Sequence, residues 1–337
     1  MFIPWNSDSV RLTGRWSRVY ENPSDPHIFA NQGCGSATTT APGSYFEAAV
    51  TGEWARLRFD LGNMGFPAPH LWIQVDGGAM TEAPVDKFLR ISMKSGSHVI
   101  KVIYKGGSEV LPRWYQTLMG MISFVGVEAE GAGVLPEDKR PIIEFLGDSI
   151  TEGVLVDADY DTVPAYTNGQ FNRVYQDDVT ATYGWLTAEK LNLRPIFQAY
   201  GAIGLTREGN GSVPRAGLIY PYVFDHVPYT GEKPDFVVIN HGANDRGTAK
   251  EEYLARYEEL IDLIHATNPN AVIVCLGAFC GAYDEELGDF VRKLDCDYVH
   301  FVSTKDWISP EPLHPLRDGH STVANKLAPI IKQILKL

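Results

Sequence analysis

Positive charge is scarce in this sequence. Its 29 Lys and Arg residues are outnumbered by 42 Asp and Glu residues, which gives a formal net charge of −13 at pH 7. A surface of that charge repels polyanions over most of its area. No Lys/Arg run or zinc-knuckle spacing offsets the repulsion. We therefore expect no nucleic-acid partner.

Cysteines and long hydrophobic runs are also few. The four cysteines are irregularly spaced, and two of them, Cys275 and Cys296, lie in apolar stretches typical of small buried thiols. No run of about 18 apolar residues is present, so the sequence predicts no membrane-spanning helix. Residues 1–8 lack the basic and then apolar pattern of a secretory signal. These absences predict a reduced, cytoplasmic protein without a membrane partner.

Motifs that bind metals or phosphates are missing as well. The sequence has no His-Glu-x-x-His, no Cys-x-x-Cys pair and no calcium loop. It also has no Gly-rich phosphate loop that leads into a helix. We therefore expect no metal and no cofactor, so that any chemistry would rest on side chains alone. A homo-oligomer is compatible with the sequence.

The chain contains two patterned regions, in keeping with its 337 residues. Residues 1–125 carry short alternating segments and Gly- and Pro-rich turns, without helical periodicity. The clearest segment, residues 53–61, places Ala55, Leu57, Phe59 and Leu61 on one face. This pattern predicts an all-β sandwich.

A linker is predicted over residues 126–140, where Gly, Pro and charged residues are concentrated. In residues 141–337 apolar, strand-like runs alternate with helical periodicity. The expected strands cover 142–146, 195–200, 236–240, 271–276 and 298–302, and the expected helices cover 185–191, 251–266, 284–294 and 321–337. This alternation predicts an α/β domain with a parallel sheet that has helices on both faces.

The first strand of this second region ends at a reactive side chain. Residues 142–146 are apolar apart from Glu144, and the run stops at Gly147-Asp148-Ser149. In open α/β sheets, ligands bind at the carboxyl ends of the strands. Ser149 is therefore placed where a nucleophile would be expected, but it needs a base and an oxyanion site to react.

Three later stretches supply candidates for those partners. Residues 200–206, which contain Gly204, follow one predicted strand, and Asn240-His241-Gly242-Ala243-Asn244-Asp245 ends another. His314 stands just before the last helix. Strand ends in a parallel sheet meet at one edge, so these residues are expected to lie near Ser149.

These four blocks resemble those of the SGNH, or GDSL-type, serine hydrolases, in the order of that superfamily. Gly147-Asp148-Ser149-Ile150 resembles the nucleophile block, Gly204 the glycine block, Gly242-Ala243-Asn244-Asp245 the Gly-x-Asn-Asp block and His314-Pro315 the histidine block. The resemblance covers residue 141 to the C-terminus and implies a three-layer α/β/α hydrolase domain.

A β-domain in front of such a hydrolase further resembles carbohydrate esterase family two. Thr13-Gly14-Arg15-Trp16, Ala41-Pro42-Gly43-Ser44 and Val75-Asp76-Gly77 look like turns of the jelly-roll domain of that family. This resemblance implies that the partner is a small-molecule or oligosaccharide ester. It implies an esterase that removes acetyl groups from plant-derived oligosaccharides such as those of xylan or mannan.

The resemblance also implies roles for individual residues. Ser149 would attack the ester carbonyl, and His314 would accept the proton of Ser149 and pass it to the leaving alcohol. The oxyanion would be held by the backbone N–H groups of Ser149 and Gly204 and by the amide of Asn244. Asp148 and Asp245 would support the turns that carry these groups.

Three arrangements are candidates for the group that orients His314, which in a serine hydrolase triad is a carboxylate. The position three residues before His314 holds Glu311, where the superfamily usually has aspartate. Asp306 is an alternative, and so is a Ser-His pair oriented by a backbone carbonyl, as in many members of carbohydrate esterase family two. Glu311 is expected as the third catalytic residue on the strength of its position.

Other readings remain open for the function and for individual segments. The chain could be a lipid or acyl-thioester hydrolase on the same scaffold, or an inactive protein that binds carbohydrate. The segment 154–184 could form a wall of the substrate pocket or a solvated insertion. His320 is expected to be structural, and His241 to lie near the pocket.

Overall fold

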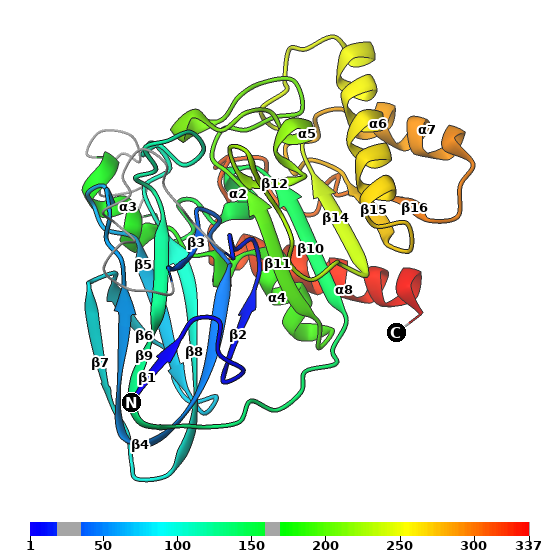
Figure 1. Cartoon of the computed structure of the whole chain (residues 1–337). Coiled ribbons are helices and arrows are strands. Elements are labelled where there is room, and N and C mark those ends of the chain that lie inside the picture. Colours follow the sequence, from blue (N-terminus) through cyan, green and yellow to red (C-terminus); the bar gives the residue numbers. More distant parts are fainter. Residues whose placement is uncertain (19–34, 159–168, 337) are drawn as a thin grey trace.

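A computed structural model describes residues 1–18, 35–158 and 169–336 of the chain. Figure 1 shows a β-rich part that holds the N-terminus and an α/β part that holds the C-terminus, joined by one extended connection. Both parts match the expected order of an all-β domain before an α/β domain.

Nine described strands make the antiparallel sheet of the first part, in the order β1-β9-β4-β8-β5-β6, with β2 and β7 on β4 and β3 on β9. The strands are β1 (Phe2–Pro4), β2 (Val10–Thr13), β3 (Ala37–Thr39), β4 (Tyr45–Phe59), β5 (His70–Val75), β6 (Thr81–Pro84), β7 (Phe88–Ser92), β8 (Ser97–Gly106) and β9 (Ile122–Ala132).

The long strand β4 connects two groups of strands. Its first half pairs with β2 and β8, and its second half pairs with β7 and most of β9. The register with β9 shifts between Thr51 and Ala55, beside Gly52 at φ 121°. Glycine suits this position because a Cβ there would lie 2.5 Å from the Glu130 side chain. The alternation predicted for residues 53–61 is confirmed for Ala55, Leu57 and Phe59, which are buried, whereas Leu61 lies beyond the end of β4 and is half-buried. The jelly-roll strand order stays a prediction.

The predicted linker begins later than expected. Residues 126–132 belong to β9, which pairs with β1 and β4, so only residues from 133 onward connect the two parts. The glycines of this stretch suggested a loop, but Gly126, at φ 154°, lies against strand β1: a Cβ on it would lie 2.4 Å from the carbonyl oxygen of Ile3. Val127 and Ala129 alternate inward and are buried.

The second part is built on a five-stranded parallel sheet with the order β11-β10-β14-β15-β16. Its strands are β10 (Ile142–Gly147), β11 (Arg194–Ala199), β14 (Phe236–Asn240), β15 (Val272–Leu276) and β16 (Val299–Val302). The second strand in sequence lies outside the first, and the third lies on the other side of it. The strand order therefore reverses at β10, and the crevice beside such a switch point is where open α/β sheets bind ligands.

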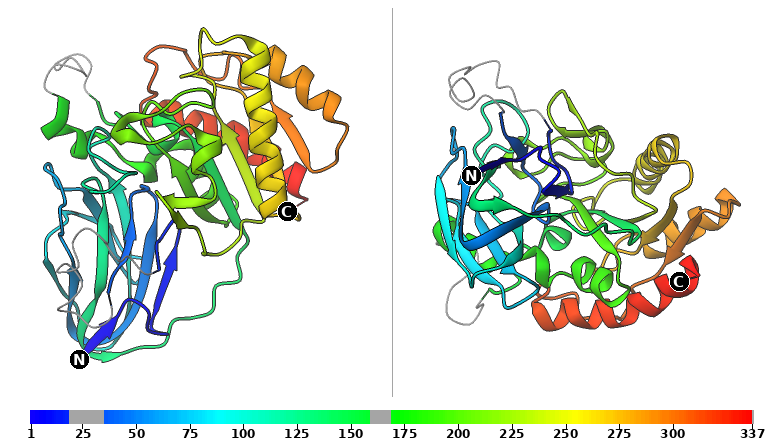
Figure 2. Two further views of the ribbon diagram at one scale, coloured as in Figure 1. Left: turned by 45° about the horizontal axis from the view of Figure 1, so that its top comes forward. Right: turned by 60° about the horizontal axis from the view of Figure 1, so that its bottom comes forward.

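Helices cover both faces of this sheet. The α-helices are α2 (Ser149–Glu152), α3 (Gly169–Gln176), α4 (Tyr183–Lys190), α5 (Ala216–Ile219), α6 (Lys250–Thr267), α7 (Asp284–Leu294) and α8 (Arg317–Leu335), with short 3-10 turns at Val179–Ala181 and Asn210–Ser212 and a hairpin of β12 (Tyr222–Phe224) and β13 (Val227–Pro228). Figure 2 shows α8 and α6 on opposite sides of the strands.

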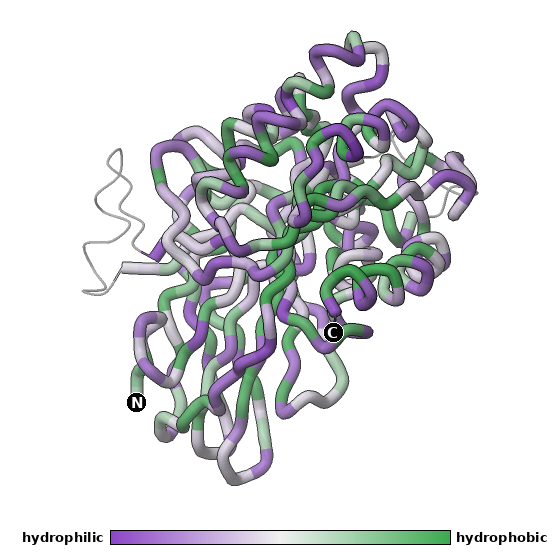
Figure 3. The backbone as a smooth tube through the Cα atoms, turned by 90° about the vertical axis from the view of Figure 1, so that its right-hand side faces the viewer, coloured by the Kyte–Doolittle hydropathy of each residue, from purple (hydrophilic) through white to green (hydrophobic). Residues whose placement is uncertain are grey.

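Alternate residues of the strands supply the two cores. Val237, Ile239 and Ile273 pack with residues of α5, α6 and α7, whereas Val238 and Val274 pack with residues of α4 and α8. Figure 3 shows hydrophobic stretches through the middle of the molecule, with hydrophilic stretches alternating along the outer helices. The three-layer α/β/α arrangement is confirmed.

The two parts share a buried contact that explains the one charged residue of β10. Glu144 accepts hydrogen bonds from Arg15 of the β-domain, at 2.8 Å from Nε and 2.6 Å from Nη2. Arg15 also donates to the carbonyl of Tyr220 at 2.7 Å and lies over the rings of Tyr220 and Tyr229. Both members of the pair are buried, so Glu144 in an otherwise apolar strand is the anchor for the β-domain.

Candidate active site

The turn after β10 presents Ser149 at the sheet edge. Ser149 is the first residue of α2, and the Asp148 carboxylate caps that helix by accepting from the backbone N–H of Ile150 at 2.9 Å. The first N–H groups of a helix have no partner within the helix. The backbone N–H of Ser149 therefore points out of the helix start, where an oxyanion donor is needed.

His314 reaches this serine from the loop before α8. Its Nε2 lies 2.9 Å from Oγ of Ser149, and both residues are buried. Burial lowers the pKa of His314 to about 4, with the charge of Glu109 acting in the opposite direction. The imidazole is therefore neutral near pH 7 and can accept the serine proton.

The other two predicted oxyanion donors come to the same edge. The amide of Asn244 donates to Oδ2 of Asp148 at 3.2 Å and to the carbonyl of Ile203 at 3.0 Å. The backbone N–H of Gly204 donates to the carbonyl of Arg207 at 3.1 Å. The structure thus links the nucleophile, glycine and Asn-Asp blocks, and a bound oxyanion would have to share or replace these acceptors.

Asp245 holds the glycine block in place. Its carboxylate accepts from the backbone N–H of Leu205 at 3.1 Å and from that of Thr206 at 2.8 Å. The hydroxyl of Thr206 adds a third hydrogen bond at 2.7 Å. A Cβ on Gly204 would lie 2.6 Å from Oδ1 of Asp245, so this approach suits glycine.

The acid predicted for the triad is not brought to the histidine. Glu311 and Asp306 are both exposed. The backbone of Glu311 is hydrogen-bonded to Ser309: its carbonyl accepts from Oγ of Ser309, and its N–H donates to the same Oγ. Among the described residues, no carboxylate is hydrogen-bonded to the His314 ring. The arrangement is therefore a buried Ser-His pair, and the role predicted for Glu311 stays a prediction without a contact.

The comparison with known proteins fits this geometry. The profile of the GDSL-like lipase/acylhydrolase family matches residues 145–322, which is more than half of the chain. The matched span contains Ser149, Gly204, Asn244 and His314. The chain belongs to this family. It is therefore a carboxylic ester hydrolase.

Relatives of this acylhydrolase include proteins with both of its parts. An acetylxylan esterase / glucomannan deacetylase of Cellvibrio japonicus (strain Ueda107) is 26% identical over 263 residues, which cover 72% of this chain and 68% of that protein. A solved family two carbohydrate esterase from Cellvibrio japonicus superposes with a TM-score of 0.78 at 20% identity, covering 100% of this chain and 98% of the other. One from Clostridium thermocellum, in complex with cellohexaose, gives 0.71 at 22% identity, covering 97% and 99%. The whole two-part fold is thus similar to that of family two carbohydrate esterases.

Several charged residues of the site could not be found by motif. Arg113, from the β-domain, pairs with Glu152 of the nucleophile helix, and both are buried. Arg173 of α3 pairs with Glu109 at 2.9 Å and with Asp177 at 3.4 Å. Burial raises the pKa of Asp177 to about 7, against the effect of Arg173. The Arg113–Glu152 and Arg173–Glu109 pairs each join the β-domain to the hydrolase part, so no spacing pattern marks them, whereas Arg173 and Asp177 are only four residues apart.

The two remaining histidines near the site are buried. His320 accepts from the backbone N–H of Tyr183 at 3.1 Å, the structural contact expected for it. Burial lowers the pKa of His241 to about 4. Of segment 154–184, residues 159–168 lie outside the described part. Val154, Leu155 and Ala158 pack with Leu316, two residues after His314, so this part of the segment is not a solvated insertion.

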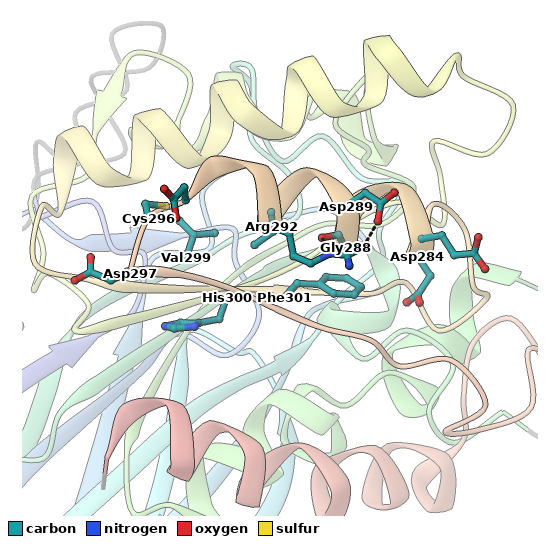
Figure 4. A pocket seen from close by; sticks show the side chains of 12 residues that line it. Asp284, Gly288, Asp289, Arg292, Cys296, Asp297, Val299, His300 and Phe301 are labelled. Atoms are coloured by element: carbon teal, nitrogen blue, oxygen red, sulfur yellow. Dashed lines mark hydrogen bonds and ion pairs between the residues drawn. The ribbon is translucent and has the colours of Figure 1, made fainter.

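A cavity of about 890 Å³ lies elsewhere, between α7 and the edge strand β16 (Figure 4). Arg292 there is paired with Asp289, and none of the predicted site residues lines the cavity. Within the described residues, no cluster of three His, Cys, Asp or Glu side chains is placed to bind a metal ion. None of the described helices is long and apolar enough to cross a membrane.

Proposed function

We propose that this acylhydrolase removes acetyl groups from O-acetylated plant-derived oligosaccharides of the xylan or mannan type, using Ser149 and His314. The observation that carries the proposal is the 2.9 Å contact between Nε2 of His314 and Oγ of Ser149 at the carboxyl end of β10. The relative named acetylxylan esterase / glucomannan deacetylase supports the choice of acetyl groups and of these glycans.

In the first half of the reaction, Oγ of Ser149 forms a bond to the acetyl carbonyl carbon while Nε2 of His314 takes the hydroxyl proton. The negative charge on the carbonyl oxygen is stabilised by the N–H groups of Ser149 and Gly204 and the amide of Asn244. The bond to the sugar oxygen then breaks, and His314 gives its proton to that oxygen. An acetyl ester of Ser149 remains.

In the second half, water attacks the acetyl ester, and His314 now accepts a proton from the water. The tetrahedral intermediate uses the same oxyanion donors. Its collapse releases acetate and returns the proton to Ser149. No group other than water is consumed, so a buried neutral imidazole and a serine are sufficient for the chemistry.

A substrate panel tests the proposed specificity. The wild-type protein is given acetylated xylo- and manno-oligosaccharides, 4-nitrophenyl acetate, a long-chain 4-nitrophenyl ester and an acyl-thioester. We expect acetate release from the oligosaccharides and from 4-nitrophenyl acetate to dominate. Preferential hydrolysis of the long-chain ester or the thioester, with no acetate from the sugars, would favour a lipid or thioester hydrolase and contradict the proposal.

The protein could instead bind glycans without turning them over, since one structural neighbour was solved with cellohexaose. A binding protein would retain oligosaccharides with equal affinity in the wild type and in Ser149→Ala, and neither would release acetate.

We also propose a cytoplasmic location, which cell fractionation would test.

A further inference from the structure

One carboxylate of the β-domain reaches into the hydrolase part. Glu109 lies in the segment after β8, and its Oε1 accepts from Nη2 of Arg173 at 2.9 Å. The side chain of Asn210 donates a further hydrogen bond to it. The Glu109 side chain is 12% exposed, so it is held firmly but remains accessible.

This carboxylate lies at the carboxyl end of the parallel sheet. A Cβ on Gly201 would lie 1.7 Å from Oε2 of Glu109, so the carboxylate packs directly on the backbone of Gly201. Gly201 follows β11, and the neighbouring Tyr200 donates its backbone N–H to the carbonyl of Gly147 at 3.3 Å. Gly147 stands two residues before Ser149. Oε2 of Glu109 therefore lies near the carboxyl ends of β10 and β11.

The charge of Glu109 also acts on His314, so the same carboxylate lies on the histidine side of this edge of the sheet. The charge of Glu109 raises the pKa of His314, while that of Arg173 lowers it, although burial has the larger effect on the ring. Both charges are thus within electrostatic range of the imidazole. His314 must hand its proton to the leaving alcohol, so the alcohol part of the ester lies on this side of Ser149.

We propose that Glu109 binds the sugar from which the acetyl group is removed, with Oε2 accepting a hydrogen bond from a hydroxyl of that sugar. The inference rests on the proposed function and names a contact for its substrate. A carboxylate is an acceptor with room for several hydrogen bonds, and bonds to an ionised acceptor are stronger than neutral ones. Arg173 binds Oε1, Asn210 donates to the same carboxylate, and Oε2, which packs on Gly201, would use a further acceptor position for the sugar hydroxyl.

Glu109 is poorly suited to act as the acid of a triad. Burial alone would raise the pKa of Glu109, but Arg173 and Arg113 outweigh it and hold the pKa below its usual value. The carboxylate is therefore ionised, yet its charge is largely balanced by Arg173. A balanced ion pair offers little net stabilisation to an imidazolium, whereas it can still bind a neutral sugar hydroxyl.

The test is the steady-state kinetics of Glu109→Gln on acetylated xylo- and manno-oligosaccharides and on 4-nitrophenyl acetate. Losing a hydrogen bond to a charged acceptor costs on the order of 10- to 100-fold. We expect kcat/KM for the oligosaccharides to fall by about that factor, mainly through KM, and at least about tenfold more than for 4-nitrophenyl acetate. The acid limb of the pH profile should shift to lower pH for all substrates alike, because the charge of Glu109 no longer raises the pKa of His314.

Glu47→Gln is the matched control. Glu47 is also a partly buried carboxylate of the β-domain paired with an arginine, Arg11, at 2.5 Å, but it lies within the β-sheet, on β4 between β2 and β8. This variant should change neither substrate. If Glu109→Gln fails to fold by near-UV circular dichroism, Glu109→Asp keeps the charge for Arg173 and withdraws the oxygens by one methylene. The same selective loss on the sugars is expected.

Equal losses on the oligosaccharides and on 4-nitrophenyl acetate would show that Glu109 acts through His314, and would overturn the inference. Unchanged kinetics on the sugars would also overturn it, while leaving the proposed function intact. If the wild type itself releases no acetate from the sugars, the proposed function fails and this inference falls with it.

Discussion

His314 combines burial with a position in contact with Ser149, and this combination sets its chemistry. Water solvates a charged imidazolium, so removing water lowers the pKa of the ring, here to about 4. A neutral ring is the form that can take a proton from Ser149. The ring is thus neutral over the whole neutral pH range, which is the form that the proposed mechanism requires.

The pH dependence of the reaction follows from this pKa. Below about pH 4 His314 is protonated and cannot act as a base, and above that value it is neutral. We therefore expect kcat/KM for 4-nitrophenyl acetate to fall as the pH drops through about 4. Titration of His314 should cause no change in kcat/KM near pH 6.5, the ordinary pKa of a histidine. Initial rates from pH 3 to pH 9 give this profile.

Asp148 supplies the control for that profile. Burial raises the pKa of Asp148 to about 7, so a second inflection could come from its titration. Asp148→Asn keeps a capping oxygen and removes the titration, and the limb assigned to His314 should persist in this variant. An acid limb near 6.5 in both proteins would contradict a base with a lowered pKa.

The carboxylate partner of His314 gives a second prediction. Glu311 and Asp306 are exposed, and neither contacts the ring in the described structure. We expect Glu311→Gln and Asp306→Asn to retain kcat/KM within about threefold, because exposed charges interact weakly with their surroundings. His314→Ala should lose at least about 1000-fold. A loss of 100-fold or more in Glu311→Gln would instead assign this residue to the mechanism.

At this scale the sequence predicted the groups that belong to contiguous motifs. Ser149 and His314 stand in short blocks that end or begin elements, so their meeting followed from the strand order. Glu311 was expected from spacing alone, but whether a side chain faces a ring depends on the loop conformation. Arg113 and Arg173 lie in no motif, and their partners Glu152 and Glu109 lie 39 and 64 residues away, which no local pattern encodes.

The turns at the ends of β10, β11 and β14 act as one unit. Asp148 joins the first turn to the third through Asn244, and Asp245 joins the third to the second through Leu205 and Thr206. The positions of the proposed oxyanion donors therefore depend on the carboxylates of Asp148 and Asp245. These carboxylates position the site.

The role of Asp245 can be tested by Asp245→Asn. An amide leaves one backbone N–H facing another donor, so we expect a loss of about 1–3 kcal/mol in the free energy of unfolding. Displacing the Gly204 turn should lower kcat by roughly 10- to 100-fold. Urea unfolding and turnover of 4-nitrophenyl acetate measure the two effects.

Asp262→Asn serves as the control, because Asp262 is exposed on α6 and far from these turns in sequence. It should change neither quantity. If Asp245→Asn loses stability while kcat stays at the wild-type value, Asp245 supports the fold without positioning the oxyanion donors.

Most elements of the second part were predictable from periodicity. The strand and helix positions agree with expectation to within a few residues, because buried parallel strands are continuous apolar runs and α6 carries an apolar stripe. Helix α8 begins at Arg317, four residues before the expected start, and continues through Pro329. The error at β9 had a different origin, since glycines that allow close strand approach look like loop residues in a sequence.

The whole molecule depends on contacts between its two parts. The β-domain supplies Arg15 to Glu144 in β10 and Arg113 to Glu152 in the nucleophile helix. Removing one partner of a buried ion pair leaves the other charge buried and unpaired. The β-domain is therefore a structural component of the hydrolase site, which its sequence pattern alone did not reveal.

Arg15→Met tests this dependence. Leaving Glu144 buried and unpaired should lower the free energy of unfolding by about 3–5 kcal/mol, whereas Arg15→Met/Glu144→Met should recover most of the loss. Arg292→Met, which removes an exposed pair with Asp289, should cost less than about 1 kcal/mol. Urea unfolding of the full chain measures all three. If Arg15→Met were as stable as the wild type, the Arg15–Glu144 pair would not hold the two parts together.

The most direct test of the proposed chemistry compares wild type with Ser149→Ala for acetate release from acetylated xylo- and manno-oligosaccharides, with 4-nitrophenyl acetate as a second substrate. Removing the nucleophile of such a unit costs on the order of a million-fold in kcat. We expect acetate from both kinds of substrate with the wild type and none above background with the variant. Acetate release by Ser149→Ala at a rate near that of the wild type would contradict the assignment of Ser149 as the nucleophile.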